Sequence, residues 1–110
     1  MNYRISWTRY AQKSLNDILE YIIEHDGKII AHKIYQKIQD KTNLLKVSPL
    51  QGRELKELKS LKKKYREIII TPWRIIYSVE NDVVSVLLII DGRRDMEELL
   101  YEMIINSDFT

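Results

Sequence analysis

Hydrophobic and polar positions at the start of the chain first alternate and then take a helical period. Residues 3–7 alternate large apolar side chains with smaller or polar ones, which predicts a short half-buried strand. After Thr8, a plausible N-cap, apolar residues recur on one helical face, which predicts a helix that ends near His25. Residues 26–27 interrupt this pattern, and it restarts over residues 30–48. The first half of the chain therefore predicts a strand followed by a helical hairpin.

The second half of the chain has mainly the pattern of strands. Residues 49–64 are rich in lysine with scattered leucines, and they predict a basic loop with one or two local turns. Residues 65–70 and 73–80 are rich in β-branched and aromatic side chains, and they meet at Thr71-Pro72, which predicts a β-hairpin. Residues 83–91 are almost continuously apolar, which predicts a central strand covered on both faces.

An amphipathic pattern that follows Asp95 predicts a last helix and completes the order β-α-α-β-β-β-α. Two successive helices form a single right-handed crossover less easily than one helix does. We therefore expect an α+β fold, with an N-terminal strand, a helical hairpin, an antiparallel three-stranded meander and a C-terminal helix. No repeat or linker divides the chain, so a single domain over residues 1–110 is expected.

Composition narrows the class of protein. The chain has 45% hydrophobic and 31% charged residues, which is typical of a soluble globular domain. Its longest apolar run, residues 86–90, is far shorter than the roughly 20 residues that span a bilayer, so we expect a cytoplasmic protein. Cysteine is absent, which excludes disulfides and thiolate chemistry.

Charge is distributed unevenly along the chain, although its net value is only +2. Residues 28–66 contain twelve basic residues against three acidic ones, whereas residues 95–110 contain five acidic residues and no basic one. Such an asymmetry favours a nucleic acid, a nucleic-acid enzyme or an acidic protein as partner.

Common catalytic and cofactor motifs are absent from the sequence. His25 and His32 have no third ligand at metal-binding spacing, so we interpret them as surface residues and expect no metal. There is no glycine-rich phosphate loop and no nucleophile elbow, so no cofactor is expected. Trp73 and Tyr77 share one strand face and are interpreted as core. Lys62-Lys63-Lys64 can either protect a sheet edge or contact phosphates.

The arginines are the most informative polar residues. Arg74 lies inside an otherwise apolar strand and needs a partner, which can be Glu67, Asp91, a phosphate or an acidic protein surface. If residues 71–72 form a two-residue turn, Arg74 shares a face with Glu67, whereas an odd-length loop aligns it with Arg66. The sequence leaves this register open.

Four fragments together resemble the RelE/ParE toxin superfamily of type II toxin-antitoxin systems. They are Trp7 with Ala11, Leu15, Ile18 and Tyr21; Pro49-x-x-Gly52-Arg53; Trp73-Arg74-Ile75-Ile76-Tyr77; and Asp91-Gly92-Arg93-Arg94-Asp95. The resemblance spans nearly the whole chain, and the superfamily has the element order predicted above. It implies a small toxin that a cognate antitoxin neutralises by folding onto its grooves and basic surface.

The ribonuclease branch of this superfamily implies a catalytic set of Arg66, Arg74, Arg94 and Tyr101. Two lysines of that branch correspond to Arg66 and Ile68 here, and Tyr101 comes one residue later than expected. Arginine rarely exchanges a proton near neutral pH and isoleucine cannot, so the set is incomplete for RNA cleavage.

The ParE branch is more similar, because it shares Gly52-Arg53, the Arg-Ile-Ile-Tyr strand and the Gly-Arg-Arg motif. This resemblance implies a poison of DNA gyrase that stabilises the cleavage complex and hydrolyses nothing itself. The target contacts it implies are Arg53, Arg74, Arg93 and Arg94. The alternatives are a ribosome-dependent mRNA endoribonuclease of the RelE kind and an inactive toxin-like binding domain.

Overall fold

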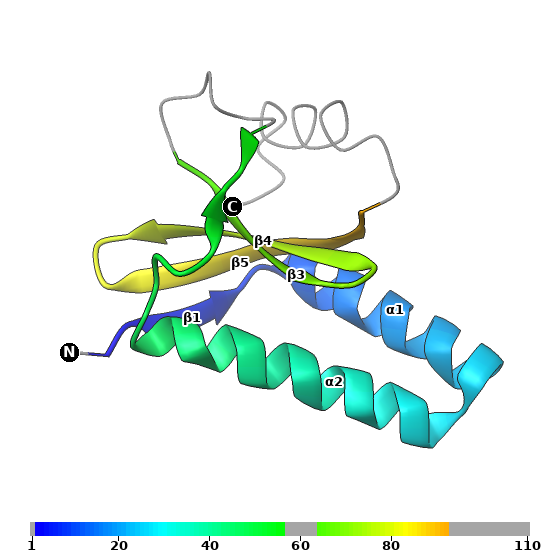
Figure 1. The fold of residues 1–110 in the computed structure, drawn as a ribbon. Coiled ribbons are helices and arrows are strands. Elements are labelled where there is room, and N and C mark those ends of the chain that lie inside the picture. The colour runs from blue at the N-terminus through cyan, green and yellow to red at the C-terminus, as the bar shows by residue number, and fades with distance from the viewer. Residues whose placement is uncertain (1, 57–63, 93–110) are drawn as a thin grey trace.

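A strand and a helical hairpin open the chain in the computed structural model, which describes residues 2–56 and 64–92 (Figure 1). The N-terminal elements are β1 (Arg4–Trp7), α1 (Arg9–Asp26), α2 (Lys28–Asn43) and a short 3-10 helix, η1 (Leu44–Lys46). Neither α-helix in these described ranges has the length and hydrophobicity of a membrane-spanning segment.

Both ends of α1 are set by the residues that the sequence pattern indicated. The hydroxyl of Thr8 accepts a hydrogen bond from the amide of Ala11 at 3.0 Å, as an N-cap does. Gly27 ends the helix with φ of 91°, a conformation that favours glycine, and its amide donates to the carbonyls of Ile22 and Ile23. The predicted cap and the predicted break are confirmed.

Two predicted boundaries differ from the structure. The second helix was expected to continue to residue 48, but α2 ends at Asn43, and the tighter turn of η1 brings Leu45 into the core. The segment 49–64 was expected to be a loop, but it contains the short strand β2 (Arg53–Glu54). Two residues are too few to produce a period in the sequence, so only pairing with another strand reveals β2.

The strands form one mixed sheet in the order β1-β5-β4-β3-β2. Its other members are β3 (Arg66–Ile70), β4 (Trp73–Glu80) and β5 (Val83–Asp91). β1 runs parallel to β5, and the remaining pairs are antiparallel. β5 is therefore an interior strand, although β4 has the middle position. The predicted α+β fold is confirmed, while the predicted C-terminal helix lies outside the described residues.

The helical hairpin covers one face of the sheet (Figure 1), and the main core lies between them. Tyr77 is fully buried in this core and Trp73 packs against it, as predicted. The cluster joins residues of both helices and η1 to residues of β3, β4 and β5: Ala11, Leu15, Ile38, Leu45, Ile68, Ile70, Ile75, Tyr77, Val84, Val86 and Ile89.

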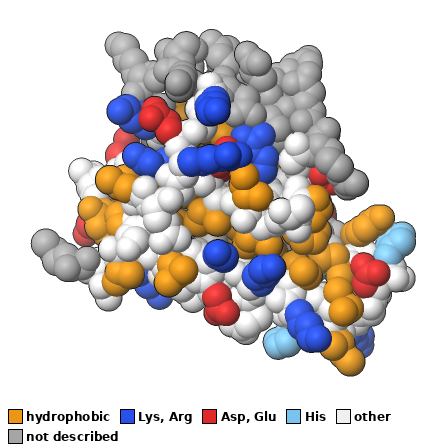
Figure 2. Space-filling model, viewed as in Figure 1, with side chains coloured by type: hydrophobic (Ala, Val, Ile, Leu, Met, Phe, Trp, Pro, Cys, Tyr) orange, Lys and Arg blue, Asp and Glu red, His pale blue; other side chains and the backbone are white. Residues whose placement is uncertain are grey.

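The other face of the sheet has a different character. Alternation along β3 and β4 directs Glu67, Ile69 and Arg74 away from the helices. On the side of the molecule drawn in Figure 2, lysine and arginine side chains gather over β2 and β3, above a band of hydrophobic side chains. This basic region is where the candidate site lies.

Candidate functional site

The connection between β3 and β4 decides which groups meet on the open face of the sheet. Thr71-Pro72 is a two-residue turn, and Ile69 pairs with Arg74 across it. Glu67 lies two residues before Ile69 and so shares a face with Arg74, whereas Arg66 points to the opposite face. Of the two registers that the sequence allowed, the structure has the one that joins Arg74 to Glu67.

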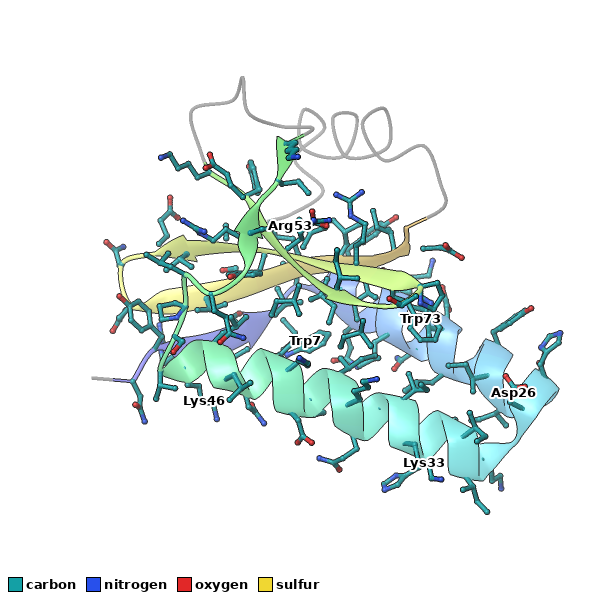
Figure 3. The ribbon with its side chains drawn as sticks, viewed as in Figure 1. Trp7, Asp26, Lys33, Lys46, Arg53 and Trp73 are labelled. Atoms are coloured by element: carbon teal, nitrogen blue, oxygen red, sulfur yellow. The ribbon has the colours of Figure 1, made fainter. Side chains whose placement is uncertain are left out.

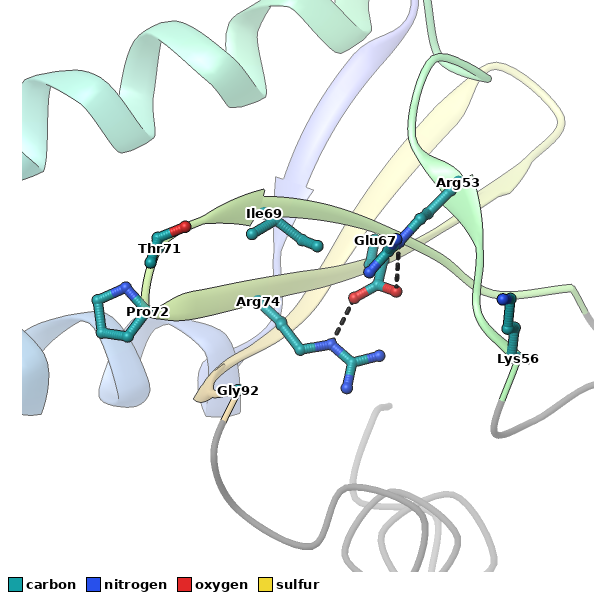
Figure 4. A pocket seen from close by; sticks show the side chains of 8 residues that line it. All are labelled: Arg53, Lys56, Glu67, Ile69, Thr71, Pro72, Arg74 and Gly92. Atoms are coloured by element: carbon teal, nitrogen blue, oxygen red, sulfur yellow. Dashed lines mark hydrogen bonds and ion pairs between the residues drawn. The ribbon is translucent and has the colours of Figure 1, made fainter.

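Glu67 is held between two arginines from two other strands (Figure 4). Its Oε2 accepts from Nε of Arg53 at 3.0 Å, and its Oε1 accepts from Nε of Arg74. The register of β2 on β3 sets Arg53 directly opposite Glu67. Each arginine thus uses its Nε atom on a different carboxylate oxygen, and one acidic residue positions two guanidinium groups.

Burial makes the ion pair between Glu67 and Arg74 strong, whereas exposure makes the pair between Glu67 and Arg53 weak. The side chains of Glu67 and Arg74 are only 3% and 13% exposed, whereas that of Arg53 is 64% exposed. A buried carboxylate must be compensated by charge and hydrogen bonds, which Arg74 supplies with little competition from water. Arg53 is screened by solvent, so it contributes less to stability and is more accessible to a ligand.

A tyrosine on the opposite face of the sheet fixes the loop that leads into Arg53. The hydroxyl of Tyr77 donates to the carbonyl of Pro49 at 2.8 Å and accepts from the amide of Gly52 at 2.9 Å. Gly52 is packed so closely that an added Cβ would lie 2.5 Å from that hydroxyl and 2.7 Å from the carbonyl oxygen of Glu67. Only glycine at position 52 allows the loop backbone to lie this close to Tyr77 and β3. The backbone immediately before Arg53 is thereby fixed in place.

Burial raises the pKa of the Tyr77 hydroxyl above its ordinary value of 10.0, and the hydrogen bond from Gly52 and the charge of Arg66 oppose this only partly. The phenol is therefore neutral at physiological pH. A neutral hydroxyl can both donate and accept, which is what its two loop contacts require.

The two arginines form part of a pocket of about 580 Å³ on this face (Figure 4). Among the described residues its lining has three cations and one carboxylate: Arg53, Lys56, Glu67, Ile69, Thr71, Pro72, Arg74 and Gly92. Guanidinium and ammonium groups around a hollow bind phosphate or carboxylate oxygens well. The pocket can therefore hold an anionic group of a target.

Of the other residues of the expected ribonuclease set, Arg66 alone lies in the described part of the chain, and it is not at this pocket. Arg66 donates from Nη1 to the carbonyl of Gly52 at 2.8 Å and does not line the pocket. Ile68, at the second lysine position of that branch, is buried in the core. Arg93, Arg94 and Tyr101 lie outside the described residues, so their roles stay predictions.

Sequence reasoning did not single out Lys56 or the central role of Glu67. Lys56 was one of many lysines in the segment 49–64, and only the pairing of β2 with β3 brings it to the pocket. Glu67 was recognised as one of several partners for Arg74, but its contact with Arg53 joins residues fourteen positions apart. Within the described ranges, no three His, Cys, Asp or Glu side chains cluster closely enough to hold a metal ion.

A mixed sheet with a helical hairpin on one face is the fold that the resemblance to the RelE/ParE toxins implied. A family model described as "ParE toxin of type II toxin-antitoxin system, parDE" matches residues 5–96, and the chain belongs to this family.

Individual proteins agree with this assignment. Toxin ParE3 of Caulobacter vibrioides is 25% identical over 93 residues, which cover 84% of this chain and 90% of that toxin. The solved structure of the chromosomal ParDE TA system from P. aeruginosa superposes with a TM-score of 0.67 at 21% identity, covering 81% of this chain and 95% of the matched one. At that identity the superposition supports the fold.

Proposed function

We propose that this toxin inhibits DNA gyrase in the cytoplasm by stabilising the cleavage complex, and that a cognate antitoxin neutralises it. Arg53 and Arg74 are the proposed target contacts among the described residues, and Arg93 and Arg94 complete the set. Growth arrest follows when the antitoxin is removed. The toxin acts by binding and has no catalytic step of its own.

The observation that carries this choice is the orientation of the two positions at which the ribonuclease branch has lysines. Ile68 is buried in the core, and Arg66 bonds the carbonyl of Gly52. Neither residue can exchange protons with a substrate held in the basic pocket. This favours a binding function for the pocket over RNA cleavage.

The chemistry of the pocket is suited to docking on an anionic target. Arg53 is largely exposed, and its contact with Glu67 through Nε restricts the orientation of its guanidinium group. Guanidinium groups bind phosphate and carboxylate groups with two parallel hydrogen bonds, and holding them in advance lowers the entropic cost of binding. A gyrase cleavage complex offers both DNA phosphates and acidic protein side chains.

Similarity to known proteins supports the proposed antitoxin. The family description and the matched structure both refer to toxin-antitoxin pairs named ParDE. By extension we propose that this chain also has a protein antitoxin, which binds the free toxin and keeps it from its target.

The test is to incubate the purified chain with gyrase, ATP and plasmid, and to score supercoiling and trapped cleaved DNA. A parallel reaction with translating ribosomes is scored for cleavage of messenger RNA. Three variants are compared: Arg53→Gln, Arg74→Gln and, as a charge-matched control, Arg4→Gln on the exposed part of β1, away from the pocket.

We expect gyrase-dependent cleaved DNA to accumulate with the wild type and Arg4→Gln, and to fall with Arg53→Gln. Thermal unfolding checks that each variant is folded. This check is needed most for Arg74→Gln, because the side chain of Arg74 is largely buried. Cleavage of messenger RNA with unaffected gyrase contradicts the proposal and favours the ribonuclease alternative. Inactivity in both reactions favours an inactive binding domain.

A further inference from the structure

A second hollow lies next to the basic pocket and has the opposite charge. It is about 530 Å³ in volume and lies between α1 and the end of the sheet at which β4 begins and β5 ends. Its lining among the described residues is Tyr10, Ser14, Asp17, Ile18, Tyr21, Ile22, Asp26, Pro72, Trp73, Ile89, Ile90 and Asp91. We call it the acidic groove.

Charge distinguishes the acidic groove from the rest of the molecule. Three aspartates, Asp17, Asp26 and Asp91, belong to its described lining, and that lining contains no lysine, arginine or histidine. The chain as a whole has a net charge of +2, so this concentration of carboxylates is local. Asp17 and Asp26 are exposed, so they attract a cationic group here and repel a phosphate.

The groove also has the apolar and aromatic surface that a peptide side chain needs. Isoleucines of α1 and β5 line it together with three aromatic rings, those of Tyr10, Tyr21 and Trp73. Tyr21 is 60% exposed, and its ring stacks on His25 with the ring centroids 4.0 Å apart. Carboxylates near exposed aromatic rings bind lysine and arginine through both charge and cation–π attraction.

We propose that the acidic groove docks an amphipathic segment of a partner protein that carries lysine or arginine among apolar residues. The apolar side chains of the segment lie against the partly exposed Ile18 and the exposed ring of Tyr21. Its cations face Asp17 and Asp26, which are both exposed. Charge complementarity selects this partner over nucleic acid, whose phosphates the aspartates repel.

The acidic groove and the basic pocket are neighbouring but distinct hollows. Pro72 is the one described residue that lines both hollows, and its carbonyl accepts a hydrogen bond from the amide of Gly92 at 2.8 Å. The β3–β4 turn is thus tied to the end of β5 and forms the wall between them. A segment bound in the acidic groove therefore lies beside the basic pocket.

Trp73 provides a local signal for the test (Figure 3). The chain has two tryptophans, so the Trp7→Phe background leaves Trp73 as the single emitting indole. Two synthetic amphipathic peptides without aromatic residues are titrated, one of leucine and lysine and the other of leucine and glutamate. The groove variant is Asp17→Asn with Asp26→Asn, and the control is Glu20→Gln with Glu24→Gln, exposed acids of α1 that do not line the groove.

We expect the lysine peptide to shift the emission of Trp73 and the glutamate peptide to leave it unchanged. Two rim charges together change affinity by about tenfold, so the groove variant should bind the lysine peptide about tenfold more weakly and the control variant as tightly as its parent. Higher salt should weaken the binding.

Equal binding of the two peptides would overturn the proposal, because apolar contact alone would then explain it. An equal loss in the control variant would also overturn it, by assigning the effect to general charge. Sedimentation of the free chain tests a second copy as the occupant: self-association that the groove variant abolishes would assign the groove to a homodimer instead. Gyrase trapping is measured without peptide, so either proposal can fail alone.

Discussion

Replacing Glu67 with glutamine removes the one negative charge shared by two guanidinium groups while leaving the shape of the side chain almost unchanged. Glu67 and Arg74 are largely buried, and a charged hydrogen bond of this kind contributes about 1.5–3 kcal/mol. Arg53 is 64% exposed, so its pair contributes only about 0–1 kcal/mol. The Glu67→Gln variant should therefore lose about 1.5–4 kcal/mol of unfolding free energy.

Urea unfolding followed by circular dichroism measures this loss, and a thermal scan gives an independent value. For a domain of this size 1 kcal/mol corresponds to about 4 °C, so the midpoint should fall by roughly 6–16 °C. Glu54→Gln is the matched control, because Glu54 is an exposed acid on β2 next to Arg53, and it should change stability by less than about 0.5 kcal/mol.

A double-mutant cycle with Arg74→Met separates the ion pair from other effects of the substitution. If the pair is as strong as its burial indicates, the coupling free energy between Glu67 and Arg74 should exceed about 1 kcal/mol. A Glu67→Gln variant as stable as Glu54→Gln, or a coupling near zero, would refute the view that Glu67 organises the basic pocket.

Three further substitutions test the supports of the site and of the fold. Tyr77→Phe leaves two loop groups without their partner and should cost about 1–3 kcal/mol in urea unfolding. Burial raises the folded-state pKa of Tyr77 above 10.0, so its contribution to the unfolding free energy is complete below pH 10.0 and is lost as the pH rises through the folded pKa. Tyr77→Phe should therefore reduce the loss of stability at alkaline pH. Part of that loss should persist in the variant, because the pKa of Tyr65 is also raised. Gly52→Ala should cost about 1–3 kcal/mol through crowding, and its combination with Tyr77→Phe should cost less than the sum, since the hydroxyl at 2.5 Å is then gone; strict additivity would contradict this contact. Thr8→Ala should lower the thermal midpoint by the equivalent of about 1 kcal/mol, whereas Thr8→Ser should not; equal losses would mean that the hydroxyl cap is unimportant.

The order of the α-helices and the longer strands could be predicted from the sequence because each signal is local. Thr8 caps α1 with a hydrogen bond to a residue three positions ahead, and Gly27 ends the helix through its own backbone conformation. The hairpin at Thr71-Pro72 and the apolar strand that follows it likewise depend on neighbouring residues. Such patterns were sufficient for an α+β class and for the order of the α-helices and the longer strands over the described part of the chain.

Contacts between distant segments were beyond this reasoning. β2 has two residues and exists because it pairs with β3, and Leu45 reached the core through a 3-10 turn rather than a longer α-helix. The hydroxyl of Tyr77 was expected only as part of a core side chain, yet it bonds residues 25 and 28 positions away. Hydrogen bonds of this range leave no period in a sequence.

The same division applies to the candidate site. The resemblance identified Arg53 and Arg74, and the strand pattern indicated that Arg74 needs a partner, so the residue types and their positive charge came from the sequence itself. The partner was decided by the tertiary structure, because side chains alternate between the two faces of a sheet and a change of one residue in the turn would have aligned Arg74 with Arg66 instead. Local sequence determines which strand an arginine occupies, but only the register between strands determines the face and the neighbours that it meets.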